Sequence, residues 1–528
     1  MPVFRHAVAS FDPTATAVLL WTRLTGATEA EWVLARDEAL TDIVASGSAV
    51  TGPARDATVV VDVDGLEPGQ TWWYRFTALG ERSPVGRTRT LPLTGPVDLG
   101  LVSCARYSVA PLTVYRALAE REVDLVVHLG DYVYEDDGHK GHRSHRPART
   151  AVSLEDYRDR IAQMREDADC QALHLRHPVV TVLDDHDLAD NAWRGGAKAH
   201  DPAEHGPWGA RVEAALRARA EWLPTRDPRL WRAVDLGGVG SLLLLDSRSE
   251  GRDLQAGESG ATAYDDPDRS LLGDEQRAWL SEQLRDPRPW ALVANGVVVN
   301  SLELPATVPA ALLPEDYAEH DGHVLRSDLW DGYAAERDTL VRELAAREGS
   351  SLLLSGDVHS SWAFDGPCLD GEPVTNELVV PSVSSAPLGR TRLPGAWRLL
   401  DALADRMPHV VWSDLTERGF VHLRVTPAEV HATWHWVDPY ANDLHPSTEP
   451  AASLTVTAGR ARWTTAEPLV MDTPPGPPLG PRPPDVAAVR HWHQRRRWAG
   501  LAAVGAALGA TGLLAARSLG SRLPTARS

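Results

Sequence analysis

The feature that most constrains the fold is a series of short apolar runs that alternate with helical stretches from residue 99 onward. Each run has four or five residues and is rich in Val and Leu, which is typical of strands buried on both faces of a sheet. We predict strands at Leu99–Val102, Leu125–Leu129, Val179–Leu183, Ser241–Leu245, Trp290–Val293 and Ser351–Leu354. Helices are predicted at Leu112–Arg121, Leu154–Glu166 and Gly209–Trp222. This alternation predicts a layered α/β domain.

The sequence pattern of the first 92 residues is typical of an all-β module. Strand-like runs at Ala17–Arg23, Thr58–Val63 and Trp72–Phe76 are separated by turn signals, and we predict an immunoglobulin- or fibronectin-like β-sandwich at residues 1–92. The α/β domain is predicted at residues 93–466. It ends in two further strands, Phe420–Val425 and Val430–Val437.

The C-terminal residues differ from the rest. Residues 467–494 are predicted to be a Pro-rich linker, and residues 495–528 a basic and apolar tail. Within this tail, three arginines precede the uncharged run Trp498–Ala516, which is long enough to span a bilayer. Because the run is rich in Ala and Gly, an amphipathic or disordered tail stays open as the alternative to a membrane anchor.

Composition excludes some classes of protein. The net charge of −20 argues against a nucleic-acid partner, and three cysteines cannot make a disulfide framework. No apolar signal segment follows Met1. We therefore predict a cytoplasmic protein, with a possible tether to membrane lipid through the C-terminal segment. Composition does not indicate an oligomeric state.

Side chains that bind metals follow several of the predicted strands. They are Cys104; Asp131 and Tyr134; Asp184, Asp185, His186, Asp187, Asp190 and Asn191; Asn295; and Asp357 and His359. Open α/β sheets bind their ligands beyond the carboxyl ends of the strands, so these side chains are expected to lie close together. Clustered buried carboxylates are costly without cations, so the pattern predicts a metal site.

The ligand types indicate two different metals. A thiolate and a phenolate suit a soft or trivalent transition ion, whereas Asp and Asn oxygens suit calcium, magnesium or manganese. Asp131 is the carboxylate expected to bridge both ions, as in two-metal phosphoryl transfer. His186, flanked by aspartates that can orient it, is the predicted acid for the leaving group.

These motifs resemble the PhoD-type alkaline phosphatases, metallophosphoesterases related to purple acid phosphatases. The shared order is Ser-Cys, Gly-Asp-x-x-Tyr-Glu, Asp-Asp-His-Asp, Asn and Gly-Asp-Val-His-x-Ser-Trp, within a resemblance that covers roughly residues 4 to 440. The resemblance implies an α/β metallophosphoesterase-like layered sandwich that hydrolyses phosphate monoesters or diesters with metal-activated water.

The resemblance also implies the metals and their ligands. Fe³⁺ is expected at Cys104, Asp131, Tyr134 and His359. Ca²⁺ is expected at Asp131, Asp357 and one or more of Asp185, Asp190 and Asn191. Zn²⁺ or Mn²⁺ is the alternative metal pair. Asn295 is a weaker candidate, because the family's Asn-Gln pair appears here as Asn295-Gly296.

Departures from the family pattern keep a second function open. Asp187 stands where relatives often have Glu, and Asp190 where they often have Asn. The alternative is therefore a membrane-tethered phosphoester-binding protein with a degenerate, inactive site.

Two further features of the sequence, a loop rich in His and Arg and the residue Arg248, each allow two interpretations. The loop that carries His139, His142, Arg143, His145 and Arg146 is either solvated or a lid whose arginines meet the substrate phosphate. Arg248 is either structural or a phosphate clamp.

Overall fold

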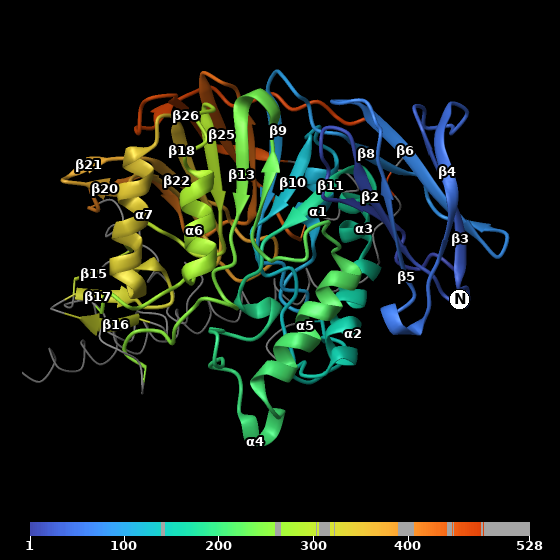
Figure 1. Cartoon of the computed structure of the whole chain (residues 1–528), viewed down its shortest axis with the longest axis horizontal. Helices are drawn as coiled ribbons and strands as arrows, with labels where there is room; N and C mark the ends of the chain where they lie inside the picture. Colours follow the sequence, from blue (N-terminus) through green and yellow to red (C-terminus); the bar gives the residue numbers. More distant parts are fainter. Residues whose placement is uncertain are drawn as a thin grey trace, which may run out of the picture. The chain divides into compact units, whose positions relative to one another are not determined.

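The computed structural model of the chain describes residues 1–138, 143–258, 266–302, 304–305, 317–320, 323–388, 406–440, 446, 448–476 and 479. Two large mixed sheets dominate the described residues (Figure 1). The first has ten strands in the order β27-β26-β25-β24-β9-β10-β11-β1-β2-β5. Their bounds are β1 (Val8–Phe11), β2 (Val18–Arg23), β5 (Thr58–Val63), β9 (Val97–Val102), β10 (Leu125–His128), β11 (Pro178–Thr181), β24 (Gly419–Val425), β25 (Glu429–Trp436), β26 (Glu449–Thr457) and β27 (Thr464–Thr465).

The second sheet has seven strands in the order β12-β13-β14-β18-β22-β19-β23. Their bounds are β12 (Arg232–Asp235), β13 (Gly240–Leu244), β14 (Trp290–Ala294), β18 (Ser350–Ser355), β19 (Ser361–Asp365), β22 (Asn376–Val379) and β23 (Val410–Asp414). All six strands predicted between residues 99 and 354 are confirmed, with small shifts at their ends. They divide between the two sheets, β9, β10 and β11 in the first and β13, β14 and β18 in the second.

The two sheets pack face to face and are covered by helices on their outer faces. Leu99 and Val127 of the first sheet share a buried core with Leu244 and Leu352 of the second. The outer face of the first sheet packs against α1 (Thr113–Ala119), α2 (Leu154–Glu166), α3 (Ala168–Arg176) and α5 (Trp208–Trp222). The outer face of the second packs against α6 (Asp274–Gln283) and α7 (Ala334–Ala346). The layers therefore run helix, sheet, sheet, helix, and the three predicted helices are confirmed as α1, α2 and α5.

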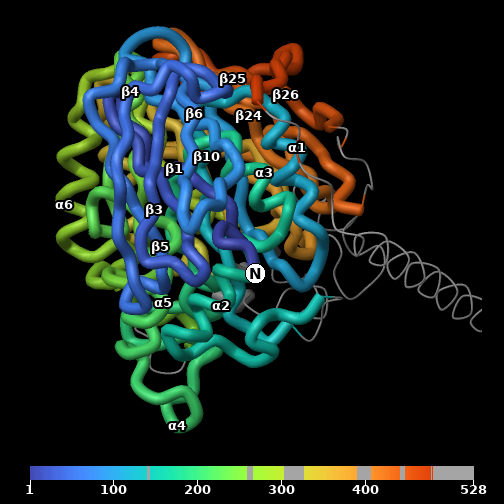
Figure 2. Tube along the Cα trace, turned by 90° about the vertical axis from the view of Figure 1, so that its right-hand side faces the viewer, coloured from blue at the N-terminus to red at the C-terminus, as the bar shows by residue number. Residues whose placement is uncertain are grey.

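The N-terminal residues are all-β, as predicted, apart from a short 3-10 turn at Pro53–Arg55. A five-stranded sheet, drawn in shades of blue in Figure 2, packs against β2 and β5 through a separate apolar core. Its strands are β3 (Glu29–Ala35), β4 (Ile43–Val50), β6 (Thr71–Ala78), β7 (Glu81–Arg82) and β8 (Gly86–Arg89). Since β1 pairs in parallel with β11, the ten-stranded sheet continues across the N-terminal residues. The immunoglobulin-like class and the boundary at residue 92 stay predictions.

Smaller elements complete the described chain. They are α4 (Pro202–His205), the sheet of β15 (Leu304–Pro305), β16 (Tyr317–His320) and β17 (His323–Arg326), the pair of β20 (Cys368–Leu369) and β21 (Glu372–Pro373), and 3-10 turns at Asp185–Asp187, Gly237–Val239 and Trp330–Tyr333. The strands predicted at 420–425 and 430–437 are confirmed as β24 and β25, and β24 pairs antiparallel with β9.

The start of the predicted Pro-rich linker lies against the folded layers. The carbonyl of Asp472 accepts the Glu122 backbone N–H at 2.7 Å, and the carbonyl of Pro475 accepts from Arg176 Nη1 at 2.9 Å. Within the described part of the chain, no helix has the length and apolar character needed to cross a bilayer. The predicted anchor at Trp498–Ala516 lies outside the described residues.

The core between the sheets predicts a stability difference. Leu352 is completely buried there, whereas Val50 on β4 is 79% exposed. Leu352→Ala is expected to lower the free energy of unfolding by about 2–5 kcal/mol, since it leaves a cavity in a packed core. Val50→Ala should change it by less than about 0.5 kcal/mol. Urea denaturation measures both, and equal effects would contradict a tightly packed inter-sheet core.

Candidate metal centre

The predicted ligand residues lie directly after the strands, where the chain leaves the sheets. Cys104 follows β9, Asp131 follows β10, and Asp357 follows β18. Several of these residues have left-handed backbone conformations that non-glycine residues rarely adopt, namely Cys104 (φ 59°), Asp131 (φ 57°), Asn191 (φ 53°), Asp357 (φ 63°) and His359 (φ 52°). Such conformations persist only where the surrounding structure holds them, and they cluster at functional sites.

Two glycines allow the strand-end loops to approach one another closely. A Cβ atom on Gly130 would lie 2.3 Å from the Asp184 Cβ, and one on Gly296 would lie 2.5 Å from Asp184 Oδ1. Gly296 therefore has a structural reason to be glycine, because any side chain there would displace the Asp184 carboxylate.

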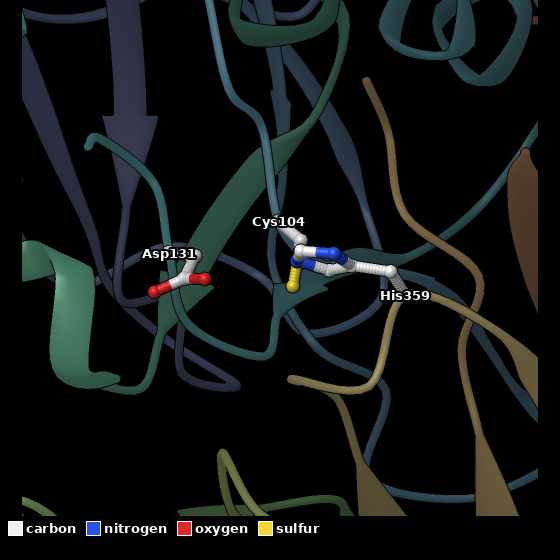
Figure 3. Close-up of side chains that lie close together, drawn as sticks. All are labelled: Cys104, Asp131 and His359. Atoms are coloured by element: carbon white, nitrogen blue, oxygen red, sulfur yellow. The ribbon is translucent and has the colours of Figure 1, made fainter. Parts of the chain in front are cut away.

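The first group of possible ligands contains Cys104, Asp131 and His359, whose ligand atoms all lie within 4.8 Å of one another (Figure 3). The Tyr134 hydroxyl joins this group. It donates to Asp131 Oδ2 at 2.8 Å, lies 3.1 Å from His359 Nε2 and accepts a hydrogen bond from Ser385 Oγ at 2.7 Å. The structure therefore brings together the four residues predicted around the soft or trivalent ion.

The tautomer of His359 is fixed by its backbone contact. Its Nδ1 lies 3.1 Å from the Ala386 carbonyl, which accepts only, so Nδ1 carries the proton and Nε2 presents its lone pair to the group. Burial, together with the charges of His186 and Arg326, lowers the pKa of His359 to about 3. A neutral imidazole with Nε2 open is the form that binds metals.

Burial has the opposite effect on the acidic members of the first group. It raises the pKa of the Cys104 thiol and of the Tyr134 phenol, and the Asp131 carboxylate raises both further. Burial also raises the pKa of Asp131, and the nearby carboxylates of Asp185 and Asp184 add to the effect. Metal binding at this group would therefore displace protons, since ligand atoms bind in their deprotonated forms.

Two further groups extend from the first. One contains Asp131, Asp185 and His186, and the other contains Asp184, Asp185 and Asp357. Asp131 belongs to the first and second groups and Asp185 to the second and third. Asp184 Oδ2 and Asp185 Oδ1 are buried without hydrogen-bond partners among the described residues. Buried carboxylate oxygens in this state fit a cation, because burying a bare charge is costly.

Arg248 partly offsets this negative charge. Its fully buried guanidinium forms an ion pair with Asp184, lies 2.7 Å from Asp328 Oδ2 and lies 3.3 Å from Asp357 Oδ1. Arg326 Nη1 lies 2.8 Å from the other oxygen of Asp357. Arg248 thus pairs with the buried carboxylates and has the structural role that was one of its two readings.

His186 is oriented by Glu135, a residue to which the sequence analysis gave no role. His186 Nδ1 lies 2.7 Å from Glu135 Oε2, and Glu135 Oε1 accepts the backbone N–H of Asp190 at 2.8 Å. Burial opposes the protonation of His186, but the charges of Glu135, Asp185 and Asp131 outweigh it and raise its pKa well above the usual value. Cations bound by the same aspartates would offset part of this increase.

The expectation that flanking aspartates orient His186 is wrong in its details. The carboxylate of Asp187 accepts backbone N–H groups from Asp131 (3.0 Å), Val133 (3.2 Å) and Asp184 (3.1 Å), so it anchors the two loops. The Asp190 carboxylate lies 3.9 Å from His186 Nε2, which is beyond hydrogen-bond distance.

The remaining candidate ligands, Asp185, Asn191 and Asn295, differ in their contacts. Asp185 belongs to two ligand groups, whereas the backbone N–H of Asn191 donates to Asp185 Oδ2 at 2.7 Å. The Asn295 amide is committed to neighbours in the core, since it donates to Ser355 Oγ at 3.2 Å and accepts from Val297 N and Trp330 Nε1.

The arginines of the loop with two readings, solvated or lid, contact residues outside the ligand groups. Arg143 contacts Asp167 and the carbonyls of Tyr107 and Ala110, and Arg146 pairs with Glu166. These contacts do not support the lid reading, because the guanidinium groups of both residues pair with acids outside the ligand groups. His139 and His142 lie outside the described residues, and His145 Nδ1 lies 2.7 Å from the Asp136 carbonyl.

Several residues around the site have no sequence signal that singles them out. Asp328 and Ser385 meet the site through tertiary contacts with Arg248 and Tyr134. Glu135 did have a signal, because it ends the Gly-Asp-x-x-Tyr-Glu motif.

Comparison with known proteins identifies the family of the chain. Residues 99–434 match the model of the PhoD-like phosphatase family, and residues 1–92 match its N-terminal domain. Alkaline phosphatase D of Bacillus subtilis (strain 168) is 30% identical over 494 residues, covering 86% of this chain and 80% of that protein. A solved structure of PhoD superimposes with a TM-score of 0.76 at 27% identity, covering 94% of this chain and 98% of that one. The chain therefore belongs to the PhoD-like phosphatase family.

Proposed function

We propose that the chain is a metal-dependent phosphatase or phosphodiesterase that hydrolyses phosphate esters at the strand-end site. The observation that carries the proposal is the position of Asp131, which belongs both to the Cys104–His359 group and to the Asp185–His186 group. One carboxylate shared by two ligand groups is the arrangement that a two-metal phosphoesterase needs. Membership of a phosphatase family supports the same activity.

The donor sets of the two groups suggest different metals. Cys104, Asp131, Tyr134 and His359 offer a thiolate, a carboxylate, a phenolate and an imidazole, a set that suits Fe³⁺, with Zn²⁺ or Mn²⁺ as alternatives. Asp131 and Asp185 of the second group, together with Asp357 of the third, offer the oxygen ligands that Ca²⁺ prefers, and Asn191 is the proposed amide ligand. When bound, the metals supply Lewis acidity that activates water and neutralises charge on the phosphoryl oxygens.

The chain's own residues perform the remaining steps. Asp131 holds the two ligand groups together, while Ser385 orients the Tyr134 hydroxyl. Glu135 holds His186 through Nδ1, which leaves Nε2 to donate its proton to the departing alkoxide. The carboxylate of Glu135 stabilises the protonated ring, in the way that an oriented acid–base pair works in other hydrolases.

The alternative of a degenerate binding protein is not favoured by any contact at the site. It rested on Asp187 and Asp190. Asp187 has a structural role as acceptor for three backbone N–H groups, and the ligand groups include Asp185 without needing either residue.

The first prediction tests turnover and the role of His186. Protein supplied with calcium and iron should hydrolyse p-nitrophenyl phosphate or bis-p-nitrophenyl phosphate. His186→Ala should lower the rate by about 10²–10⁴-fold, the usual contribution of a general acid, without loss of metal. His205→Ala on α4 serves as the matched control and should leave the rate unchanged. Absence of hydrolysis in the metal-loaded protein would favour the binding-protein alternative, and metal loss in His186→Ala would make this residue a ligand.

A second prediction concerns the shared carboxylate. Asp131→Asn should remove metal from both groups and nearly all turnover, because both groups depend on one side chain. Elemental analysis of the purified variant measures the loss. The control is Asp227→Asn, a change at an aspartate outside the site that pairs with Arg229. If Asp131→Asn lost only one metal, the bridging role would be wrong.

A third prediction concerns metal identity. If iron binds at Tyr134, the purified protein should show a visible charge-transfer band, and Tyr134→Phe should shift or bleach it. Tyr132→Phe is a matched control, since the Tyr132 hydroxyl contacts His174 Nε2 at 2.9 Å rather than a ligand group. A colourless, iron-free protein with full activity would instead indicate a zinc or manganese pair.

A further inference from the structure

Arg106 lies beside the first ligand group, two residues after Cys104. Its guanidinium carbon lies 5.2 Å from the centroid of the Tyr134 ring, and Nη2 forms an ion pair with Asp136. The backbone is held as well, because the Arg106 carbonyl accepts a hydrogen bond from Ser384 Oγ at 3.0 Å. The side chain is 23% exposed, so a fixed guanidinium reaches solvent at the edge of the ligand group.

The Arg106 guanidinium has donor capacity that the described residues leave unused. Its Nε is buried and has no hydrogen-bond partner among them. Arginine carries five N–H donors in a rigid fork, and Asp136 engages only one end of this fork. A buried donor without an acceptor is unfavourable, so an acceptor oxygen that reached it beside Tyr134 would remove this cost.

Other arginines near the site differ from Arg106 in this respect. Arg160 donates to the backbone carbonyls of Tyr134 and Asp136, and of two residues in the following loop. Arg248 is fully buried among carboxylates. Arg106 therefore combines partial exposure, a fixed position and unused donors.

We propose that Arg106 binds a charged oxygen of the substrate phosphate and makes the site favour phosphate monoesters over diesters. This inference rests on the phosphate-ester hydrolysis proposed above. Guanidinium and phosphate form charge-assisted, often bidentate hydrogen bonds. A monoester at alkaline pH carries two negative charges and keeps three unsubstituted oxygens. A diester carries one negative charge, and an alkyl or aryl group occupies one of those oxygens. The guanidinium thus gains more from a monoester.

The test compares the two substrate classes in the metal-loaded, full-length protein. Arg106→Gln should lower kcat/KM for p-nitrophenyl phosphate by about 10–100-fold, as for the loss of a hydrogen bond to a charged group. The loss for bis-p-nitrophenyl phosphate should be about tenfold smaller, since the diester has one less charge. Arg106→Lys keeps the charge without the planar fork and should restore part of the monoester activity. Arg146→Gln is the matched control, because Arg146 pairs with Glu166 away from the ligand groups.

Binding of inorganic phosphate provides a readout that does not need turnover. Arg106→Gln should weaken phosphate binding, measured by calorimetry on the metal-loaded protein, whereas Arg146→Gln should leave it unchanged. Equal losses for both substrates, or unchanged phosphate binding, would overturn the role of Arg106 and leave the phosphoesterase proposal standing. If the wild-type protein hydrolysed neither substrate, the proposed function would fail, and phosphate binding alone would decide whether Arg106 is an anion-binding residue.

Discussion

The concentration of buried carboxylates at one edge of the two sheets is the constraint on which the rest of the site depends. Asp131, Asp184, Asp185, Asp328 and Asp357 are all nearly or fully buried. Like charges at this density repel one another, and each is costly to remove from water. Part of this negative charge is neutralised by a buried arginine, Arg248. Other carboxylate oxygens, at Asp184 and Asp185, have no hydrogen-bond partners among the described residues, and metal ions would supply the missing charge there.

The two sheets make this concentration possible because each supplies half of the ligands. Cys104, Asp131 and Asp185 follow strands of the ten-stranded sheet, whereas Asp357 and His359 follow β18 of the seven-stranded sheet. Isolated bridges join the loops beyond the strands, Ser103 to Ser382 and Leu183 to Asp246. A packed apolar core between the sheets therefore sets the distance between the two halves of the site. The left-handed backbone conformations of the ligand residues are unfavourable, and the same packing holds them in place.

The contacts of His186 and Arg106 show that three neighbouring acids, Glu135, Asp187 and Asp136, have different roles. Glu135 is buried and holds His186, so its charge acts on one imidazole. Asp187 is buried as well, but backbone N–H groups satisfy it, and it acts as a fixed joint between loops. Asp136 is partly exposed and holds Arg106. Identical chemical groups thus serve as an orienter, a joint and a counter-ion according to what surrounds them.

The sequence by itself determined the central strands of both sheets, three of the helices and the identity of most candidate ligands. Apolar runs of four or five residues specify strands, and a ligand directly after such a run must lie at the strand's end, so Cys104, Asp131, Asp185, Asp357 and His359 were found from local pattern alone. Only the tertiary structure decided that these strands form two sheets, that residues 1–92 share one of them, and that Glu135, rather than an aspartate, holds His186. The reason is physical: strand formation and turn geometry depend on neighbours in the chain. Sheet partners, buried ion pairs such as Arg248 with Asp328, and donors such as Arg106 depend on residues far apart in the sequence, which only folding brings together.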